Sequence, residues 1–129
     1  MIRKAVSNDL EGIYNLISSA AKDSRILYRA KEEILNVIGA FYICEKEDKV
    51  VGCCSLEIYN KKIAEIRSLV VLPAFRNQGI ANELISACMK EAKEKNLYEV
   101  LTITDKVNLF ERKGFASCLN NQTALFIKP

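Results

Sequence analysis

The residues best suited to chemistry lie in a short polar loop, Arg76-Asn77-Gln78-Gly79, between an apolar run and a helical pattern. A strand that runs into a loop and then a helix brings free backbone N–H groups and the positive helix end to one point. Gly79 lets the backbone approach a ligand closely, and Arg76 adds a guanidinium group. The pattern predicts an anion or pyrophosphate site, although it matches neither common phosphate-loop motif. An ordinary strand–loop–helix connection with surface polar residues is the alternative.

The spacing of apolar residues predicts the elements that must position this loop. Helices are expected at residues 9–22, 31–38, 80–92 and 107–112. Asn8 and Glu11 form a capping-box-like start for the first helix, and Gly39 stops the second. Strands are expected at residues 2–6, 41–45, 50–59, 63–72, 98–103 and 124–127, with one more near 115–116. Turns at 47–49 and 60–62 make the three central strands an antiparallel meander. This order predicts a mixed α/β layer architecture.

The composition fits one globular domain over residues 1–129, with half of the residues hydrophobic and 27% charged. The net charge of +3 is too small to indicate nucleic-acid binding. No apolar run approaches the roughly 20 residues that span a bilayer, and the N-terminus lacks a signal-peptide pattern. The five cysteines include no C-x-x-C pair, which favours core thiols over disulfides or zinc. We therefore expect a cytoplasmic protein that does not associate with membranes.

The chain contains no histidine, which limits the chemistry that it can perform. Ser-His-Asp and Cys-His nucleophile systems are excluded, and so is most zinc catalysis. Any general base must be a carboxylate, Tyr, Cys, Lys or a chain of waters. No metal site is expected.

Residues 76–81 resemble the R/Q-x-x-G-x-G/A loop of the Gcn5-related N-acetyltransferase (GNAT) family, which binds the pyrophosphate of acetyl-CoA there. The resemblance covers residues 2 to about 126. It implies the GNAT fold, a mixed central sheet with helices on both faces, in which strands 63–72 and 98–103 splay apart and admit the pantetheine arm. The contacts that it implies are main-chain groups for the pantetheine (Leu69, Val70, Val71) and loop residues for the pyrophosphate (Arg76, Asn77, Gln78, Gly79, Ile80, Ala81).

Glu65 is the candidate base, in the Ala-Glu-Ile context where many family members place a Glu that accepts the amine proton, often through water. By strand alternation, Glu65, Arg67 and Leu69 should share one face. Arg67 could bind a substrate carboxylate through its fork, or pair with Glu65 or Glu57. A solvated Glu65 paired with a neighbouring lysine is the alternative for the base.

The segment 108–115 resembles the family's Y-E-K-x-G-F motif, with Phe110 in place of the Tyr that protonates the coenzyme A thiolate. Phe110 remains a cofactor-contact prediction without a proton to donate. A water or another donor would act there, or the thiolate leaves unassisted, since a thiol has a pKa of about 8.5. Arg112 could reach a cofactor phosphate, or act only as a cation at a helix C-terminus.

Three further segments resemble the acetyltransferase domain of N-acetylglutamate synthase and its short stand-alone relatives: residues 26–29, 50–56 and 64–71. That group acetylates the α-amine of glutamate at the start of arginine biosynthesis. The resemblance implies cationic residues for a dianionic substrate, with Arg29 and Arg67 as first choices and Lys106 as a third. A surface charge is the alternative for Arg29.

Two classes of function stay open at this point. One is an acetyl-CoA-dependent acetyltransferase acting on a small primary amine, with glutamate ahead of other amino acids and polyamines. The other is a catalytically weak acyl-CoA-binding module that regulates a partner. By analogy with the family, Leu125, Phe126 and Ile127 of the expected closing strand could pair across a homodimer. Whether Cys53 or Cys54 faces the thioester is also open.

Overall fold

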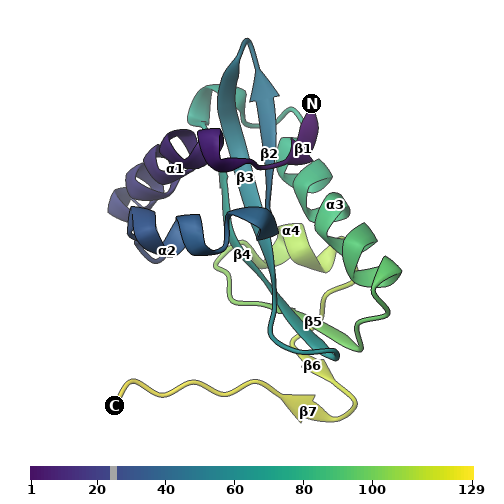
Figure 1. Cartoon of the computed structure of the whole chain (residues 1–129). Coiled ribbons are helices and arrows are strands. Elements are labelled where there is room, and N and C mark those ends of the chain that lie inside the picture. Colours follow the sequence, from purple (N-terminus) through teal and green to yellow (C-terminus); the bar gives the residue numbers. More distant parts are fainter. Residues whose placement is uncertain (24–25) are drawn as a thin grey trace.

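Figure 1 shows a computed structural model of the protein, which describes residues 1–23 and 26–129. Its centre is a five-stranded sheet in the order β1 (Ile2–Lys4), β2 (Phe41–Lys46), β3 (Lys49–Ile58), β4 (Ile63–Val71) and β5 (Glu99–Thr102). Neighbouring strands are antiparallel except β4 and β5, which are parallel. The predicted meander and mixed sheet are therefore confirmed.

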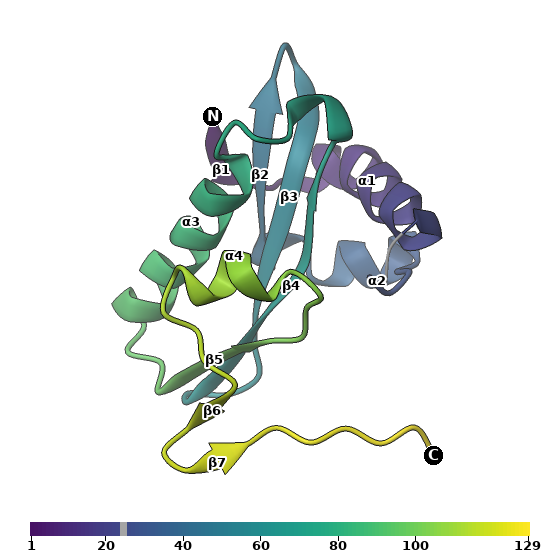
Figure 2. The same ribbon diagram turned by 180° about the vertical axis from the view of Figure 1, so that it is seen from behind.

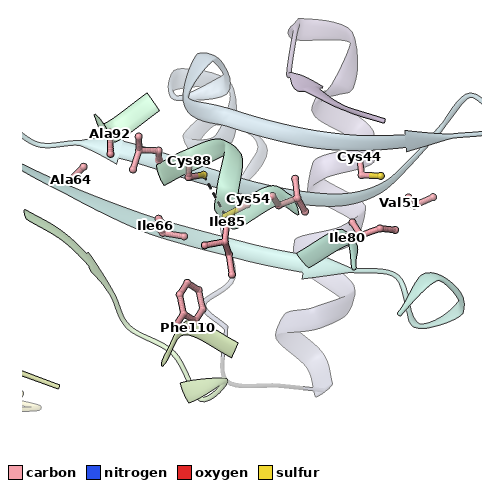
Figure 3. Packing of buried hydrophobic residues seen from close by; sticks show 12 residues of the cluster. Cys44, Val51, Cys54, Ala64, Ile66, Ile80, Ile85, Cys88, Ala92 and Phe110 are labelled. Atoms are coloured by element: carbon pink, nitrogen blue, oxygen red, sulfur yellow. Dashed lines mark hydrogen bonds between the residues drawn. The ribbon is translucent and has the colours of Figure 1, made fainter. Parts of the chain in front are cut away.

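Helices cover both faces of this sheet (Figures 1 and 2). One face carries α1 (Leu10–Asp23) and α2 (Lys31–Asn36), and the other carries α3 (Ile80–Glu94) and α4 (Val107–Glu111). Each face has its own apolar core. Figure 3 shows the core beneath α3, where the Phe110 ring points from α4 toward Ile85 and β4. The sequence periodicity predicted these helices because their apolar residues recur on one side.

Strand β4 pairs with β5 only from Ile63↔Glu99 to Ile66↔Thr102 and then continues to Val71 without β5 beside it. The splayed strand pair implied by the resemblance is thus present. On its other side, β4 contains a bulge, because Arg67 lies opposite Ser55 while Val70 lies opposite Cys53. Three steps on β4 therefore match two steps on β3, and Ser68 adopts a positive φ of 55°.

The prediction that Glu65, Arg67 and Leu69 share one face of the sheet is wrong. The bulge reverses the alternation of side chains along β4 after Arg67. Glu65 lies opposite Glu57 and Arg67 opposite Ser55, on the face covered by α1 and α2. Leu69 instead packs with the core on the α3 face. Strict alternation fails here because the extra residue turns the following side chains over.

The C-terminal region differs from the expected closing strand. Residues 124–129 form no strand, and Leu125 and Ile127 are each 89% exposed. The strands that do form are β6 (Cys118–Leu119) and β7 (Gln122–Thr123), a small hairpin apart from the main sheet, and residues 115–116 form none. An apolar segment becomes a strand only where another strand pairs with its backbone, and 124–127 has no such partner in the described residues.

The start of α1 also differs from the prediction. A 3₁₀ turn, Ser7–Asp9, precedes the helix, and the Asp9 carboxylate accepts the Val6 N–H at 2.8 Å. Asp9 therefore takes the place predicted for Glu11, but Val6 at the cap has no side-chain acceptor, so only this half of a capping box forms. Arg3 also donates two hydrogen bonds to the Asp9 carboxylate, of 2.9 and 3.0 Å, which fix its position. The predicted stop at Gly39 falls within a second 3₁₀ turn, Ile38–Ala40, after α2 has ended at Asn36.

A polar cluster centred on Glu91 connects α3 with β1 and β2. Glu91 accepts hydrogen bonds from Lys4 (3.0 Å), Tyr42 (2.7 Å) and Lys95 (2.6 Å). Burial alone would raise the pKa of Glu91, but these bonds lower that pKa to about 2. Glu91 is therefore ionised at neutral pH and stabilises the helix–sheet contact.

Among the described residues, no helix is long and apolar enough to cross a membrane.

Candidate active site

Two adjoining cavities lie where β4 and β5 separate. The first, which we call the loop cavity, has a volume of about 660 Å³ and is bordered by the end of β4 and by residues 75–77 and 79–82. The second, the gap cavity, has a volume of about 470 Å³ and lies between residues 65–69 and residues 102–106. Leu69 and Lys106 border both cavities. A ligand in one cavity can therefore reach a ligand in the other.

The loop cavity contains the predicted anion site. Gly79 caps α3 with a left-handed φ of 81°, and among the described residues no side chain caps this helix end. The first intrahelical bond runs from the Glu83 N–H to the Gly79 carbonyl, so the N–H groups of residues 80–82 precede it. The Arg76 Nε–H donates to the Val71 carbonyl at 3.3 Å, which fixes the guanidinium beside the loop. This geometry suits a phosphate group.

Most of the predicted cofactor residues meet around this cavity. It is bordered by Leu69, Val70, Val71, Arg76, Asn77, Gly79, Ile80, Ala81 and Arg112. Two others are placed elsewhere: Gln78 is exposed outside the cavity lining, and Phe110 borders the gap cavity. Phe110 is buried and packs edge-on against Phe115, with ring centroids 5.2 Å apart. Its ring is thus part of the cavity wall as well as of the α3 core.

Glu65 borders the gap cavity and is only 9% exposed. Its Oε1 accepts a hydrogen bond from the hydroxyl of Tyr59, which directly follows β3. Burial, followed by this bond, raises the pKa of Tyr59 to about 12. The hydroxyl therefore stays protonated and holds one carboxylate oxygen of Glu65. Sequence reasoning missed Tyr59, and nothing in its sequence position indicates this contact.

Arg67, the predicted carboxylate receptor, also borders the gap cavity. Of the ion-pair partners considered from sequence, Glu57 is the one in contact, with 3.3 Å between Arg67 Nη1 and Glu57 Oε1. The Arg67 side chain is 27% exposed, so its fork is reachable from the cavity side. Arg67 is thus placed where a substrate carboxylate could bind.

Arg29 was considered as a substrate ligand or as a surface charge, but the structure places it in neither position. It is 2% exposed and borders neither cavity. Its guanidinium donates to both oxygens of Glu57, at 2.7 and 3.1 Å, and to Glu33 at 2.5 Å. Burial would raise the pKa of Glu57, but hydrogen bonds from Arg29 and Ser55 hold it below its usual value. Glu57 therefore joins Arg29 to Arg67 as a buried anion. Its position beside Ser55 in an apolar strand is the signal that sequence reasoning could have used.

The remaining candidates lie at the margins or away from the cavities. Lys106 pairs with Asp105 at 3.7 Å, and both border the gap cavity. All five cysteines are free thiols, and Cys53 and Cys54 border neither cavity. Burial raises the pKa of the Cys53 thiol to about 12. Within residues 1–23 and 26–129, no group of three or more His, Cys, Asp or Glu side chains could hold a metal ion.

The chain belongs to the acetyltransferase (GNAT) family, because the family model matches residues 8–115. An uncharacterized N-acetyltransferase from Chlorobaculum tepidum is 33% identical over 114 residues, covering 88% of this chain and 74% of that protein. An amino-acid acetyltransferase from Buchnera aphidicola is 28% identical over 116 residues, covering 88% of this chain but 26% of that protein. The chain thus spans about a quarter of that longer relative. The predicted family and enzyme class, an N-acetyltransferase, are confirmed.

Solved structures agree with this fold. A Mycobacterium tuberculosis protein in complex with CoA and NLQ has a TM-score of 0.86 at 24% identity, covering 96% of this chain and 76% of that one. The N-acetylglutamate synthase of Neisseria gonorrhoeae, complexed with coenzyme A and N-acetyl-glutamate, has a TM-score of 0.78 at 23% identity. That match covers 88% of this chain and 27% of the synthase. Both neighbours hold CoA, in agreement with acetyl-CoA as the predicted co-substrate.

Proposed function

We propose that the protein transfers an acetyl group from acetyl-CoA to the α-amine of an amino acid, with L-glutamate as the first candidate. One observation carries the proposal: an anion-binding loop and a buried carboxylate, Glu65, border two cavities that meet at Leu69. Such a junction suits direct attack of a bound amine on a bound thioester in a ternary complex. The neighbours named for amino-acid acetylation support this class of acceptor.

The loop cavity fits the diphosphate and amide-bearing arm of acetyl-CoA. The amides of residues 80–82 and the cations of Arg76 and Arg112 complement phosphate charge. The part of β4 beyond Ile66 has no strand on its β5 side, so its backbone can pair with the amides of an extended ligand. When bound, acetyl-CoA supplies the thioester whose carbonyl the amine attacks.

The gap cavity supplies the groups that the acceptor needs. Glu65 would take the proton from the amine, directly or through a water, while the Tyr59 hydroxyl fixes one of its oxygens. Arg67 would bind the α-carboxylate, and Lys106, which borders the same cavity, would bind a second carboxylate. Glu65 would thus provide an uncharged amine, and Arg67 would hold the substrate by its carboxylate so that this amine lies close to the thioester.

Phe110 offers no proton to the leaving thiolate. We propose that the thiolate leaves without a side-chain acid, because a thiol pKa of about 8.5 makes it a fair leaving group. The buried ring instead excludes water from the wall of the gap cavity.

The test is the release of free thiol from acetyl-CoA in the presence of a panel of amines that includes L-glutamate, other amino acids and polyamines. We expect turnover with amino acids and the highest rate with L-glutamate, which would also favour a place in arginine biosynthesis. Turnover with polyamines alone would keep the chemistry and reject the acceptor. Acetyl-CoA binding without turnover on any amine would favour the second candidate, an acyl-CoA-binding regulatory module.

Three further proposals concern the whole chain. We propose that residues 1–129 act as one domain in the cytoplasm, where the four buried thiols stay reduced. We also propose a homodimer whose interface contains the exposed apolar residues Leu125, Phe126 and Ile127. Sedimentation of the wild type and of Phe126→Ser would test the dimer, since a dimer of unchanged stability in the variant would reject this interface.

A further inference from the structure

The bulge in β4 places a strained residue at the edge of the gap cavity. Ser68 has a φ of 55°, a conformation that costs a residue other than glycine roughly 1–2 kcal/mol. Neither Ser68 nor Leu69 has a register partner on β3 or β5. The conformation must therefore be held by contacts other than the sheet ladder.

Two side chains supply these contacts. Arg29 Nη1 donates to the Ser68 hydroxyl at 3.2 Å. The Cys53 thiol donates to the Ser68 carbonyl at 3.3 Å. The first contact is the stronger kind, because a charged guanidinium makes it. Ser68 is thus held through both its side chain and its main chain.

The Glu57 carboxylate fixes the position of the Arg29 guanidinium. Both oxygens of Glu57 accept from its fork, and the Ser55 hydroxyl donates to the same carboxylate at 2.7 Å. Such a two-point contact sets the plane of the guanidinium as well as its distance. Because Arg29 borders neither cavity, these contacts lead to the bulge and not to a bound ligand.

We propose that the Arg29–Glu57 pair is a positioning unit that holds the Ser68 bulge at the junction of the two cavities. Leu69, the next residue, borders both cavities, so the bulge sets the path of the backbone past the reacting groups. The inference rests on the proposed acetyl transfer for its kinetic part. It departs from the sequence-based role of Arg29, in which this residue binds the carboxylate of the acceptor.

The two roles predict different kinetics. A positioning unit acts on the geometry of the reaction, so Arg29→Lys should lower kcat about tenfold and leave the KM of the acceptor within about twofold. A carboxylate ligand would instead raise the acceptor KM with a smaller change in kcat. Ser68→Ala removes only the hydroxyl that Arg29 binds and should reproduce the kcat effect, which keeps the test usable if Arg29→Lys folds poorly.

Glu33→Gln is the matched control. It removes another partner of Arg29, but Glu33 is 48% exposed and supplies neither of the two contacts to Ser68 described above. We expect its kcat and KM to match those of the wild type. If Glu33→Gln lowers kcat as much as Ser68→Ala does, the effect comes from general loosening around Arg29 and the proposal is wrong.

A readout independent of activity separates this inference from the proposed function. Amide hydrogen exchange, followed by mass spectrometry on peptides that contain residues 66–71, should be faster in Arg29→Lys and Ser68→Ala and unchanged in Glu33→Gln. Unchanged exchange in both bulge variants would overturn the positioning role, whatever the activity. Faster exchange in a protein that acetylates no amine would keep the positioning role and reject the acetyltransferase proposal.

Discussion

Replacing Glu57 with Gln should lower the free energy of unfolding, because it leaves the buried Arg29 guanidinium without its main counter-charge. Gln has nearly the same shape as Glu and can still accept one hydrogen bond, but it carries no charge. Of the ion pairs that Arg29 makes in the described part of the chain, the one with Glu33 then remains, and Glu33 lies partly in solvent.

The expected magnitude follows from this burial. Removing one partner of a buried ion pair costs about 3–5 kcal/mol. Glu33 stays 2.5 Å from Arg29, so we expect the lower end, about 3 kcal/mol. With an unfolding entropy of about 2.1 cal/mol/K per residue, this loss lowers the Tm of a 129-residue chain by about 11 °C.

Thermal unfolding followed by circular dichroism, together with urea titration, measures this loss at pH 7. Glu33→Gln serves as the control, because it also removes a carboxylate from Arg29 but at a half-exposed position. We expect it to cost less than about 1 kcal/mol. A loss below about 1 kcal/mol for Glu57→Gln, or equal losses for both variants, would refute the reasoning.

The pH dependence gives a second check on the same charge. The pKa of Glu57 is lower in the folded protein than its usual value, so the carboxylate stabilises the fold above the unfolded pKa, about 4.3. The stability difference between wild type and Glu57→Gln should therefore be constant above about pH 5 and shrink as the pH falls below about 4.

Glu91→Gln should cost about 1–3 kcal/mol at pH 7, and urea titrations should find this loss shrinking as the pH falls from about 4 toward the folded pKa of about 2. Gly79→Ala should weaken acetyl-CoA binding in calorimetry and cost about 1–2 kcal/mol of stability, because φ is 81° there although a Cβ would meet open space. Gly39→Ala, at an equally open position without positive φ, should change neither quantity. Tyr59→Phe removes the hydrogen bond to the proposed base and should lower kcat about tenfold at unchanged acceptor KM, whereas Tyr98→Phe should leave both constants unchanged.

The sequence predicted those features that depend on local periodicity and local chemistry. The helices over 10–23 and 80–94 follow from apolar residues at helical spacing, and the strands of the meander follow from short apolar runs between polar turns. The loop proposed to bind an anion stands out in the sequence because Gly79 and the polar residues before it lie between a strand and a helix. These signals act over a few residues, so they can be read without the fold.

The features that the sequence did not reveal depend on contacts between distant segments. Ser68 has no glycine-like signal for its positive φ, and its strain is held by Arg29, 39 residues away in the chain. The burial of Arg29 depends on Glu57 in the same way. The tail at 124–127 has the apolar pattern of a strand but lacks a pairing partner among residues 1–23 and 26–129, and only the fold determines such a partner.

The central claim is that Glu65 accepts the proton of an amine that attacks acetyl-CoA across the junction of the two cavities. Its most direct test is the rate of thiol release with saturating L-glutamate for wild type, Glu65→Gln and the exposed control Glu32→Gln. We predict turnover in wild type and Glu32→Gln, and a kcat lower by about 10²–10⁴-fold in Glu65→Gln with acetyl-CoA binding retained. A Glu65→Gln variant that turns over as fast as the wild type would contradict the account.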